Sequence, residues 1–319
     1  MVSSGRNPYS FGYSKMDLRH LRYFIAVAEE GHITRAAERL GMQQPPLSRQ
    51  INAIERELDV QLFRRKARGV ELTDAGRALL EDARATLANL DRSFERTRRT
   101  ARGEQGQIRV GIPPTAPFHP FVLCAIRGFR EAFPLVSLTL EEFLSNELIE
   151  RLRNERMDVA FIRTSPVDPE GLVITPLLEE PMVVALPHGH ALAQGDGGEA
   201  VPLKRLASET FILYGPPGTG IDVTGAACRA AGFSPRVGQY ALRITSTLSL
   251  VAVGLGISIV PASMQRMTMD GVTYRRLRGA RQPKFVLNLA SRRGDPSAVV
   301  RHFLNLVKQA AKDFPGDRN

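Results

Sequence analysis

Apolar residues in the first sixty positions recur at intervals of three and four, which is the spacing of one face of an α-helix. The three helices that this spacing predicts cover Leu18–Glu30, Arg35–Leu40 and Gln44–Leu58. Gly31 and Gly41 are suited to end the first two helices, because glycine adopts the left-handed conformation of a helix terminus, and Thr34 is placed to cap the second. Pro45 and Pro46 are compatible with the third helix because they fall in its first turn.

The segment that follows predicts a small hairpin and then one long helix. Residues 62–72 contain two short strand-like runs around a basic turn. From Thr73 to about Arg102 there is no proline, and the apolar residues keep to a single narrow stripe. A helix of about 30 residues would span roughly 45 Å, so its stripe needs a surface to cover it. A second copy of the chain would supply that surface, and packing within its own domain is the alternative.

Beyond residue 106, strand-like and helix-like patterns alternate, which is typical of parallel strands joined by crossover helices. The strands are predicted at Gln107–Ile112, Val136–Phe143, Met157–Ile162, Met182–Leu186, Phe211–Tyr214, Ile257–Val260 and Phe285–Ala290. The helices are predicted at Phe121–Phe133, Glu147–Arg156, Val223–Ala231, Ser246–Gly254 and Pro296–Asp313. We therefore expect an all-α N-terminal region with a small hairpin and a C-terminal α/β domain.

Composition narrows the class of protein. At 319 residues, 43% of them hydrophobic, the chain can build two or three globular domains. Its net charge of +10 favours an anionic partner such as nucleic acid, with scattered surface charges as the ordinary alternative. The most apolar stretch, Leu248–Pro261, is broken by glycines and is shorter than the roughly 20 residues of a membrane span. We expect a cytoplasmic protein with no membrane partner, and residues 1–15 are interpreted as a disordered leader.

Motifs for catalysis or for metal or cofactor binding are not found, so we expect no enzyme. The run GPPGTG resembles a phosphate-binding loop, but Ile221 follows it where that motif requires Lys. His188 and His190 have no third ligand at a suitable spacing. Cys124 and Cys228 are far apart and are expected to be buried thiols.

Residues 33–58 have the arrangement of a helix-turn-helix that lays its second helix in the DNA major groove. Ala36 and Ala37 allow close helix packing, and Gly41 forms the turn. The longer run ITRAAERLGMQQPPLSRQINAIERELDVQLFRRKARGVELTDAGR resembles the signature of LysR-type transcriptional regulators, and the likeness extends over residues 16–314. Gln43 departs from the Ser of many members, which affects only the start of the third helix.

The resemblance implies an organisation of the whole chain. Residues 16–72 would be a winged helix-turn-helix, and residues 73–103 a linker and dimerisation helix. Residues 107–319 would be an effector-binding domain with a periplasmic-binding-protein-like fold. Its subdomain I would comprise residues 107–180 and 285–319, and its subdomain II residues 181–284. Members act as homo-dimers or homo-tetramers on a pseudo-palindromic operator, and an activator would also contact RNA polymerase.

The resemblance also implies which residues contact DNA. The third helix would read base edges in the major groove, the second would hold phosphates, and the basic hairpin would reach the backbone or the minor groove. Carried over position by position, the expected DNA-binding residues are Thr34, Arg35, Gln44, Pro45, Pro46, Ser48, Arg49, Arg65 and Arg68. The ordinary alternative for each arginine is a solvated surface charge.

The expected effector is a small organic or aromatic carboxylic acid. Hydroxyl-bearing residues follow two predicted strands where helix N-termini also point their amides, an arrangement that suits a carboxylate. Two of them, Thr115 and Ser145, match positions that hold the acid in muconate- and benzoate-responsive members. The other expected effector-binding residues are Asn146, Phe161, Arg163, Thr219, Gly220 and Ile221. Ser145 could instead only cap a helix near Glu147, Phe161 could be a core residue, and Arg163 could be a structural ion-pair partner.

A rival interpretation comes from a different class. The chain could be a cytoplasmic solute-binding or enzymatic α/β protein whose N-terminal helices serve only for dimerisation. The basic hairpin beside the helix-turn-helix favours DNA binding, and the lack of catalytic motifs disfavours an enzyme.

Overall fold

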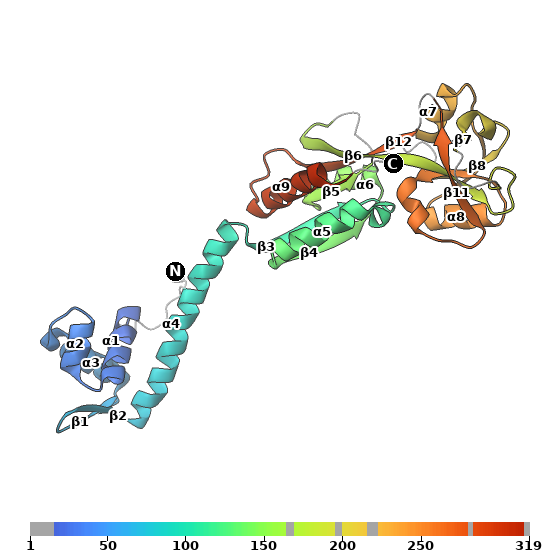
Figure 1. Ribbon diagram of the computed structural model, residues 1–319. Coiled ribbons are helices and arrows are strands. Elements are labelled where there is room, and N and C mark those ends of the chain that lie inside the picture. Colours follow the sequence, from blue (N-terminus) through green and yellow to red (C-terminus); the bar gives the residue numbers. More distant parts are fainter. Residues whose placement is uncertain (1–15, 164–168, 195–199, 216–222, 280–282, 316–319) are drawn as a thin grey trace, which may run out of the picture. The chain divides into compact units, whose positions relative to one another are not determined.

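The computed structural model describes residues 16–163, 169–194, 200–215, 223–279 and 283–315. Its internal contacts divide the chain into two units, Met1–Arg98 and Arg99–Asn319 (Figure 1). No helix among the described residues is both long enough and apolar enough to cross a membrane.

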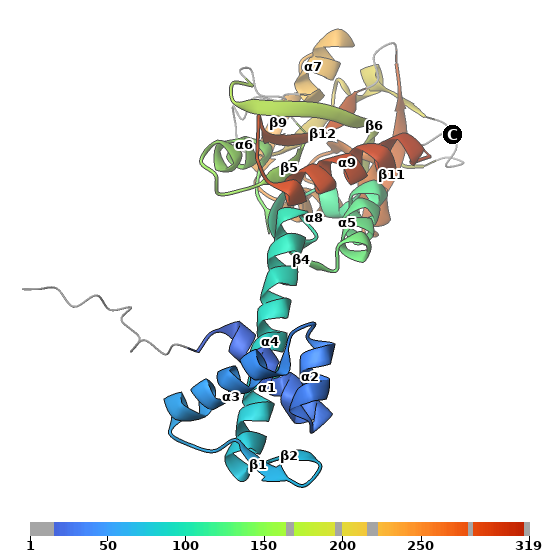
Figure 2. The ribbon, with the colours of Figure 1, turned by 90° about the vertical axis from the view of Figure 1, so that its left-hand side faces the viewer.

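The first unit is a small helical domain with a two-stranded hairpin. Its elements are α1 (Leu18–Glu30), α2 (Ile33–Arg39), α3 (Gln44–Leu58), β1 (Phe63–Lys66), β2 (Gly69–Leu72) and α4 (Asp74–Ala101). Figure 2 shows α1, α2 and α3 gathered around the part of α4 that follows the hairpin. Ala36 and Ala37 are fully buried, so α2 packs closely against its neighbours, while Phe24, Leu47 and Ile54 fill the shared core. The predicted helix-turn-helix and hairpin are confirmed.

Two details at the helix starts differ from the predictions or refine them. Thr34 does not cap α2, because the helix begins at Ile33, two residues earlier than predicted, and its N-cap is His32, whose Nδ1 accepts a hydrogen bond from the Thr34 amide. Gln43 precedes α3 without making a side-chain cap. Gly31 ends α1 with φ +60°, as expected for a left-handed terminus.

The hairpin is fixed to the helices by hydrogen bonds that its backbone amides donate. The Glu55 side chain of α3 accepts hydrogen bonds from the amides of Leu62 and Phe63 at 2.7 and 3.1 Å. The Val70 amide donates to the carbonyl of Gly31 at 2.9 Å. At Gly69, with φ +132°, a Cβ atom would lie 2.2 Å from that same carbonyl oxygen, so only glycine fits there. The hairpin is therefore held rigidly against α1 and α3.

The second unit contains one mixed sheet that runs through two hydrophobic cores. Its first strands are β3 (Gln105–Ile112), β4 (Leu135–Glu142) and β5 (Val159–Ile162), with β4 and β5 parallel to β3 on either side. The 16-residue strand β6 (Leu172–Pro187) and β12 (Lys284–Arg292) pair antiparallel, and β12 also borders β5. Beyond residue 181, β6 pairs instead with β10 (Ser258–Pro261) and β11 (Val272–Arg278). A short strand, β7 (Val201–Pro202), pairs parallel with β11.

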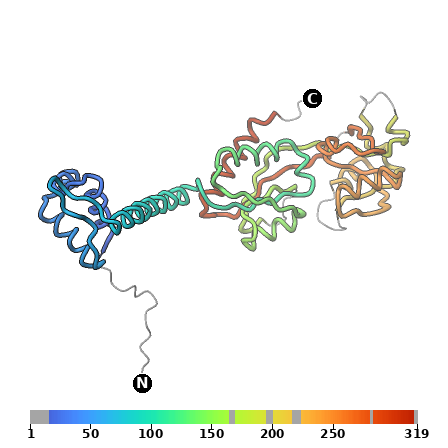
Figure 3. The backbone as a smooth tube through the Cα atoms, turned by 90° about the horizontal axis from the view of Figure 1, so that it is seen from below, coloured from blue at the N-terminus to red at the C-terminus, as the bar shows by residue number. Residues whose placement is uncertain are grey.

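Helices cover both faces of the first part of this sheet. The helices α5 (Pro120–Ala132) and α9 (Ala298–Asp313) share a core with β3 and β12, and α6 (Ser145–Arg153) packs on the opposite face against β5. Figure 3 shows the red C-terminal helix lying beside the green segments, far from it in sequence. This part of the unit thus has three layers, with the sheet between helices on its two faces, as the alternating pattern predicted.

The buried residues that form the second core come from the segment between Met182 and Leu277. It is built from β8 (Thr210–Tyr214) and β9 (Arg236–Ala241), which pair parallel, from α7 (Val223–Ala230) and α8 (Ile244–Ala252), and from β10 and β11. Short 3₁₀ turns complete the unit: η1 (Ala116–Phe118), η2 (Leu203–Leu206) and η3 (Ala262–Arg266). The expectation of two buried cysteines is half wrong, because Cys228 is buried but Cys124 is exposed on α5.

Candidate functional site

The helix α3 separates a buried face from an exposed face. Leu47, Ile51 and Ile54 point into the core of the first unit. On the other side Gln44 and Arg49 are exposed. The remaining predicted base-reading residues lie on the same first two turns: exposed Pro45 and the partly exposed Pro46 and Ser48. The structure therefore brings together the predicted major-groove residues on one side of α3.

The start of α2 and the hairpin place the other predicted DNA contacts. Thr34 and Arg35 are exposed, and the Arg35 Nη2 donates to the carbonyl of Glu30 at 2.7 Å. Arg65 on β1 and Arg68 in the turn are exposed, and neither occurs in an ion pair among the described residues. A phosphate backbone could thus approach these hairpin guanidinium groups directly.

One residue on this surface was not among the predicted contacts. Asn52 is exposed on α3, four positions after Ser48 and three after Arg49, and therefore shares their side of the helix. The helical spacing itself carries this signal, since an amide side chain there can pair with an adenine edge.

Three predicted effector residues meet at one edge of the sheet in the second unit. Thr115, Ser145 and Arg163 each follow one of the parallel strands β3, β4 and β5, so their positions converge. The Arg163 Nε donates to Thr115 Oγ1 at 2.9 Å, and the Arg163 backbone amide donates to Ser145 Oγ at 3.1 Å. All three residues are buried.

The helix-capping alternative for Ser145 is wrong. Ser145 is the first residue of α6, which begins two positions before the predicted start at Glu147, and the N-cap is Leu144, without a side-chain hydrogen bond. Its hydroxyl faces Arg163 instead. Asn146, the next residue, is exposed.

Arg163 is held by a buried carboxylate that was not predicted. Its Nη1 donates to Glu180 Oε2, and the two side chains are 5% and 4% exposed. Glu180 lies on β6, and its Oε1 accepts from the Ser263 amide of η3 at 2.7 Å. His119 Nε2 lies 4.0 Å from Glu180 Oε2. Through these hydrogen bonds, Glu180 connects Arg163, at the strand ends of the first core, to η3, which borders the second core.

The pKa of Glu180 reflects two opposing effects. Burial alone would raise it, but the positive charge of Arg163, together with Ser263 and His119, holds the pKa of this carboxyl below its usual value. Glu180 is therefore ionised at neutral pH. Arg163 is thus an ion-pair partner, as the alternative interpretation expected. The guanidinium nonetheless keeps one buried nitrogen, Nη2, without a hydrogen-bond partner among the residues that the structure describes.

The donor groups around Arg163 are suited to an anion. Thr115 and Ser145 both use their oxygens as acceptors toward Arg163, so their hydroxyl hydrogens remain to be donated elsewhere. Together with Arg163 Nη2 they form three donors at one place. A carboxylate, which accepts several hydrogen bonds, complements such a set.

The other predicted effector residues are placed differently. Phe161 is fully buried in the first core, where its ring lies edge-on to that of Phe303, 6.3 Å between centroids. Thr219, Gly220 and Ile221 lie outside the described residues. No group of three or more His, Cys, Asp or Glu in the described part of the chain is arranged to hold a metal ion.

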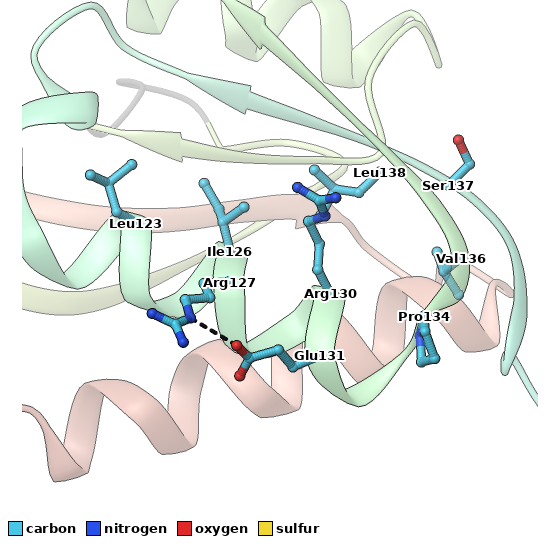
Figure 4. Close-up of a pocket in the computed structure, with 9 residues that line it drawn as sticks. All are labelled: Leu123, Ile126, Arg127, Arg130, Glu131, Pro134, Val136, Ser137 and Leu138. Atoms are coloured by element: carbon cyan, nitrogen blue, oxygen red, sulfur yellow. Dashed lines mark hydrogen bonds and ion pairs between the residues drawn. The ribbon is translucent and has the colours of Figure 1, made fainter.

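A groove lies on the surface of the second unit between α5 and β4. Its volume is about 740 Å³. Figure 4 shows α5 contributing Leu123, Ile126 and an Arg127–Glu131 ion pair, with Leu138 of β4 opposite. Leu123 is 51% exposed, so this face presents apolar surface to solvent.

Both units of the chain match known protein families. Residues 18–77 match the bacterial regulatory helix-turn-helix protein family of lysR type, and residues 101–312 match the LysR substrate binding domain. The chain is 37% identical to the HTH-type transcriptional regulator BudR of Raoultella terrigena, over 91% of this chain and 100% of that protein. It is 36% identical to the HTH-type transcriptional regulator CatR of Pseudomonas putida, over 93% of this chain and 100% of CatR.

Solved structures give the same result. Full-length CbnR complexed with its target DNA has 31% sequence identity and a TM-score of 0.81, with 93% of this chain and 100% of that chain covered. Full-length BenM has 31% identity and a TM-score of 0.59, with 95% and 100% covered. The rival solute-binding or enzymatic interpretation is not favoured. The chain belongs to the LysR family of transcriptional regulators, with an N-terminal helix-turn-helix and a C-terminal effector-binding domain.

Proposed function

We propose that this regulator binds a pseudo-palindromic DNA operator as a homo-oligomer and responds to a small organic acid bound at Thr115, Ser145 and Arg163. It acts as a regulator and not as an enzyme. In an activating role it would also contact RNA polymerase.

The exposed side of α3 is the feature that most directly supports operator reading. Leu47, Ile51 and Ile54 anchor this helix, so Gln44 and Arg49 are presented on a rigid element. Arg49 would contact guanine and Gln44 adenine, while Arg65 and Arg68 of the hairpin would reach phosphates or the minor groove. The CbnR structure, solved with its target DNA, supports this use of the domain.

Nuclease footprinting tests the operator proposal. The purified protein is added to DNA from immediately upstream of its own gene, and to the rest of the flanking region. We expect a protected sequence with two related half-sites. If no segment is protected at a concentration where CatR or another family member protects its operator, the proposed DNA recognition fails.

The buried Nη2 of Arg163 is the single observation that carries the proposed acid site. An unpartnered guanidinium nitrogen away from water is costly, and the adjacent Thr115 and Ser145 hydroxyls can donate to the same acceptor. An acid bound there would place its carboxylate at the ends of β3, β4 and β5. It would lie between the proposed subdomain I, residues 107–180 and 285–319, and subdomain II, residues 181–284.

Calorimetry with Thr115→Val tests this site. The substitution keeps the shape of the side chain and removes its hydroxyl. The probes are the sodium salts of acetate, succinate, benzoate, salicylate and cis,cis-muconate. We expect at least one acid to bind the native protein and to bind the variant roughly tenfold more weakly, since a hydrogen bond to a charged group is lost. Equal affinities would remove Thr115 from the site.

The long helix α4 supports the proposed homo-oligomer. Ala83 on its apolar stripe is buried within the first unit, but farther along the same stripe Phe94 is 52% exposed. A second copy of α4, running antiparallel, would cover this part. The groove between α5 and β4, lined by both charged and apolar residues, provides another surface for assembly into a tetramer.

A further inference from the structure

Tyr214 lies at the carboxyl end of β8, where the second core meets segments of the first. Its ring packs against a buried hydrophobic cluster that includes residues of α8 and β10. Phe118 of η1, only three residues after Thr115, packs against the same cluster. The end of β8 and the η1 turn that follows Thr115 therefore adjoin one hydrophobic cluster.

The hydroxyl of Tyr214 is buried and has no hydrogen-bond partner in the described part of the protein. A buried hydroxyl without a partner is destabilising, because it has lost its bonds to water and gained none in return. Tyr274, in the same half of the unit, shows the ordinary solution, since its hydroxyl donates to the carbonyl of Met267 at 3.2 Å. Tyr214 is thus a donor that no described residue of the fold uses.

The charges that act on Tyr214 belong to residues at the strand ends of the first core. Burial, and to a smaller extent the charge of Glu142 at the end of β4, raise the pKa of the Tyr214 phenol to about 12, against a lowering effect of Arg163 after β5. The phenol is therefore protonated at neutral pH and remains a donor. Glu142 ends β4 and Arg163 follows β5, so the charges that act on Tyr214 lie at the strand ends where Thr115 and Ser145 also lie.

We infer that the Tyr214 hydroxyl donates a hydrogen bond to the acid that Arg163 holds. This inference rests on the proposed function of that site. Two unpartnered buried donors, Arg163 Nη2 and Tyr214 Oη, then belong to one ligand and approach it from the two halves of the unit. Binding satisfies both at once, and so favours the arrangement in which the two halves are in contact. Tyr214 is a specificity-determining residue because it requires an acceptor on the side of the acid that faces β8.

The test compares Tyr214→Phe with Tyr274→Phe in the full-length protein. Each variant removes one phenol hydroxyl, but only Tyr274→Phe removes a hydrogen bond that the described residues make. Thermal unfolding without ligand and calorimetric titration with the sodium salts of acetate, succinate, benzoate, salicylate and cis,cis-muconate are measured for both variants, for the native protein and for Thr115→Val.

For Tyr214→Phe we expect a thermal midpoint no lower than that of the native protein and affinity for the bound acid roughly 10- to 100-fold weaker. For Tyr274→Phe we expect a lower midpoint and unchanged affinity. If Tyr214→Phe binds the acid as tightly as the native protein while Thr115→Val does not, the inference about Tyr214 is overturned and the acid site stands. If no acid binds the native protein, both the acid site and the role of Tyr214 are overturned.

Discussion

Arg163 and Glu180 form an ion pair that is almost completely shielded from solvent, with side chains 5% and 4% exposed. Arg163 follows β5 in the first core, whereas Glu180 lies on β6 and also accepts the amide of Ser263 in η3. This pair connects segments of both cores through one carboxylate. Any anion that binds to Arg163 shares the guanidinium with Glu180, so ligand binding and the contact between the two halves are coupled at this residue.

Glu180→Gln is expected to destabilise the second unit by about 3 kcal/mol at pH 7, because Arg163 would lose its buried counter-charge. The neighbouring Glu179→Gln is the control. Glu179 pairs with Lys284 at 2.8 Å, but its side chain is 62% exposed, so we expect about 1 kcal/mol or less. Urea unfolding of the three proteins measures the difference, and equal effects for the two substitutions would contradict the role given to Glu180.

The effect of Glu180→Gln should depend on pH with a defined sign. The folded-state pKa of Glu180 is lowered, so its contribution is fully present above the unfolded value of about 4.3 and is lost as the pH falls through the lower, folded value. The difference in unfolding free energy between the native protein and Glu180→Gln should therefore be constant from pH 7 to 5 and shrink below about pH 4. A difference that grows as the pH falls would contradict the assignment.

Arg49→Ala should weaken operator binding by about 1–3 kcal/mol and relax specificity at one base pair, since a direct base contact is lost. Lys312→Ala, an exposed position on α9, removes the same charge from the other unit and should leave binding within experimental error. Fluorescence anisotropy with the footprinted sequence and with single-base variants measures both effects. If the loss were uniform across all base variants, Arg49 would be a phosphate contact and not a base reader.

Gly69→Ala should disturb the hairpin. Its Cβ would meet the Gly31 carbonyl oxygen at 2.2 Å, and the residue has φ +132°. Gly41→Ala is the matched control, because Gly41 also has a positive φ, +65°, but nothing lies within 4 Å of the added atom. We expect Gly41→Ala to cost about 1–2 kcal/mol of stability, and Gly69→Ala to cost more and also to weaken DNA binding. The two outcomes are separated by urea unfolding and anisotropy. Similar stability losses in both variants would show that the hairpin adjusts to the clash.

Phe94→Glu should weaken self-association about tenfold or more, since burying a Phe side chain contributes roughly 1.5–3 kcal/mol. Ala85→Glu adds the same charge at an exposed position on the opposite side of α4 and should have little effect. Sedimentation velocity over a range of concentrations measures both. Unchanged association of Phe94→Glu would mean that the α4 stripe is not an interface.

The sequence predicted most elements because their apolar spacing is regular. The stripes of α1, α3 and α9 face hydrophobic cores, and their observed bounds lie within about two residues of the predicted ones. The strand β6 was predicted only at Met182–Leu186 but begins at Leu172. Its first part contains Pro176, Pro181 and two glutamates, which break the strand pattern, and its pairing with β12 depends on residues more than 100 positions away.

The candidate acid site was predictable only in part. Thr115, Ser145 and Arg163 could be found because each follows a strand, and parallel strands end at one edge. Glu180 and Tyr214 lie within strands, where local sequence gives no sign of what they face. The residues that surround Glu180 and Tyr214 are determined by the packing of β6 and β8 against segments distant in sequence. The exposure of Cys124 was missed for a similar reason, since its side of α5 faces solvent and not the core.

The most direct test of the account is a titration of the purified protein against a labelled fragment from immediately upstream of its own gene, with a scrambled fragment alongside, at several salt concentrations. The account predicts tight binding to the upstream fragment alone, with affinity falling steeply as salt increases because many phosphates are contacted. Equal, weak binding to both fragments, with Arg49→Ala indistinguishable from the native protein, would contradict specific operator recognition by α3.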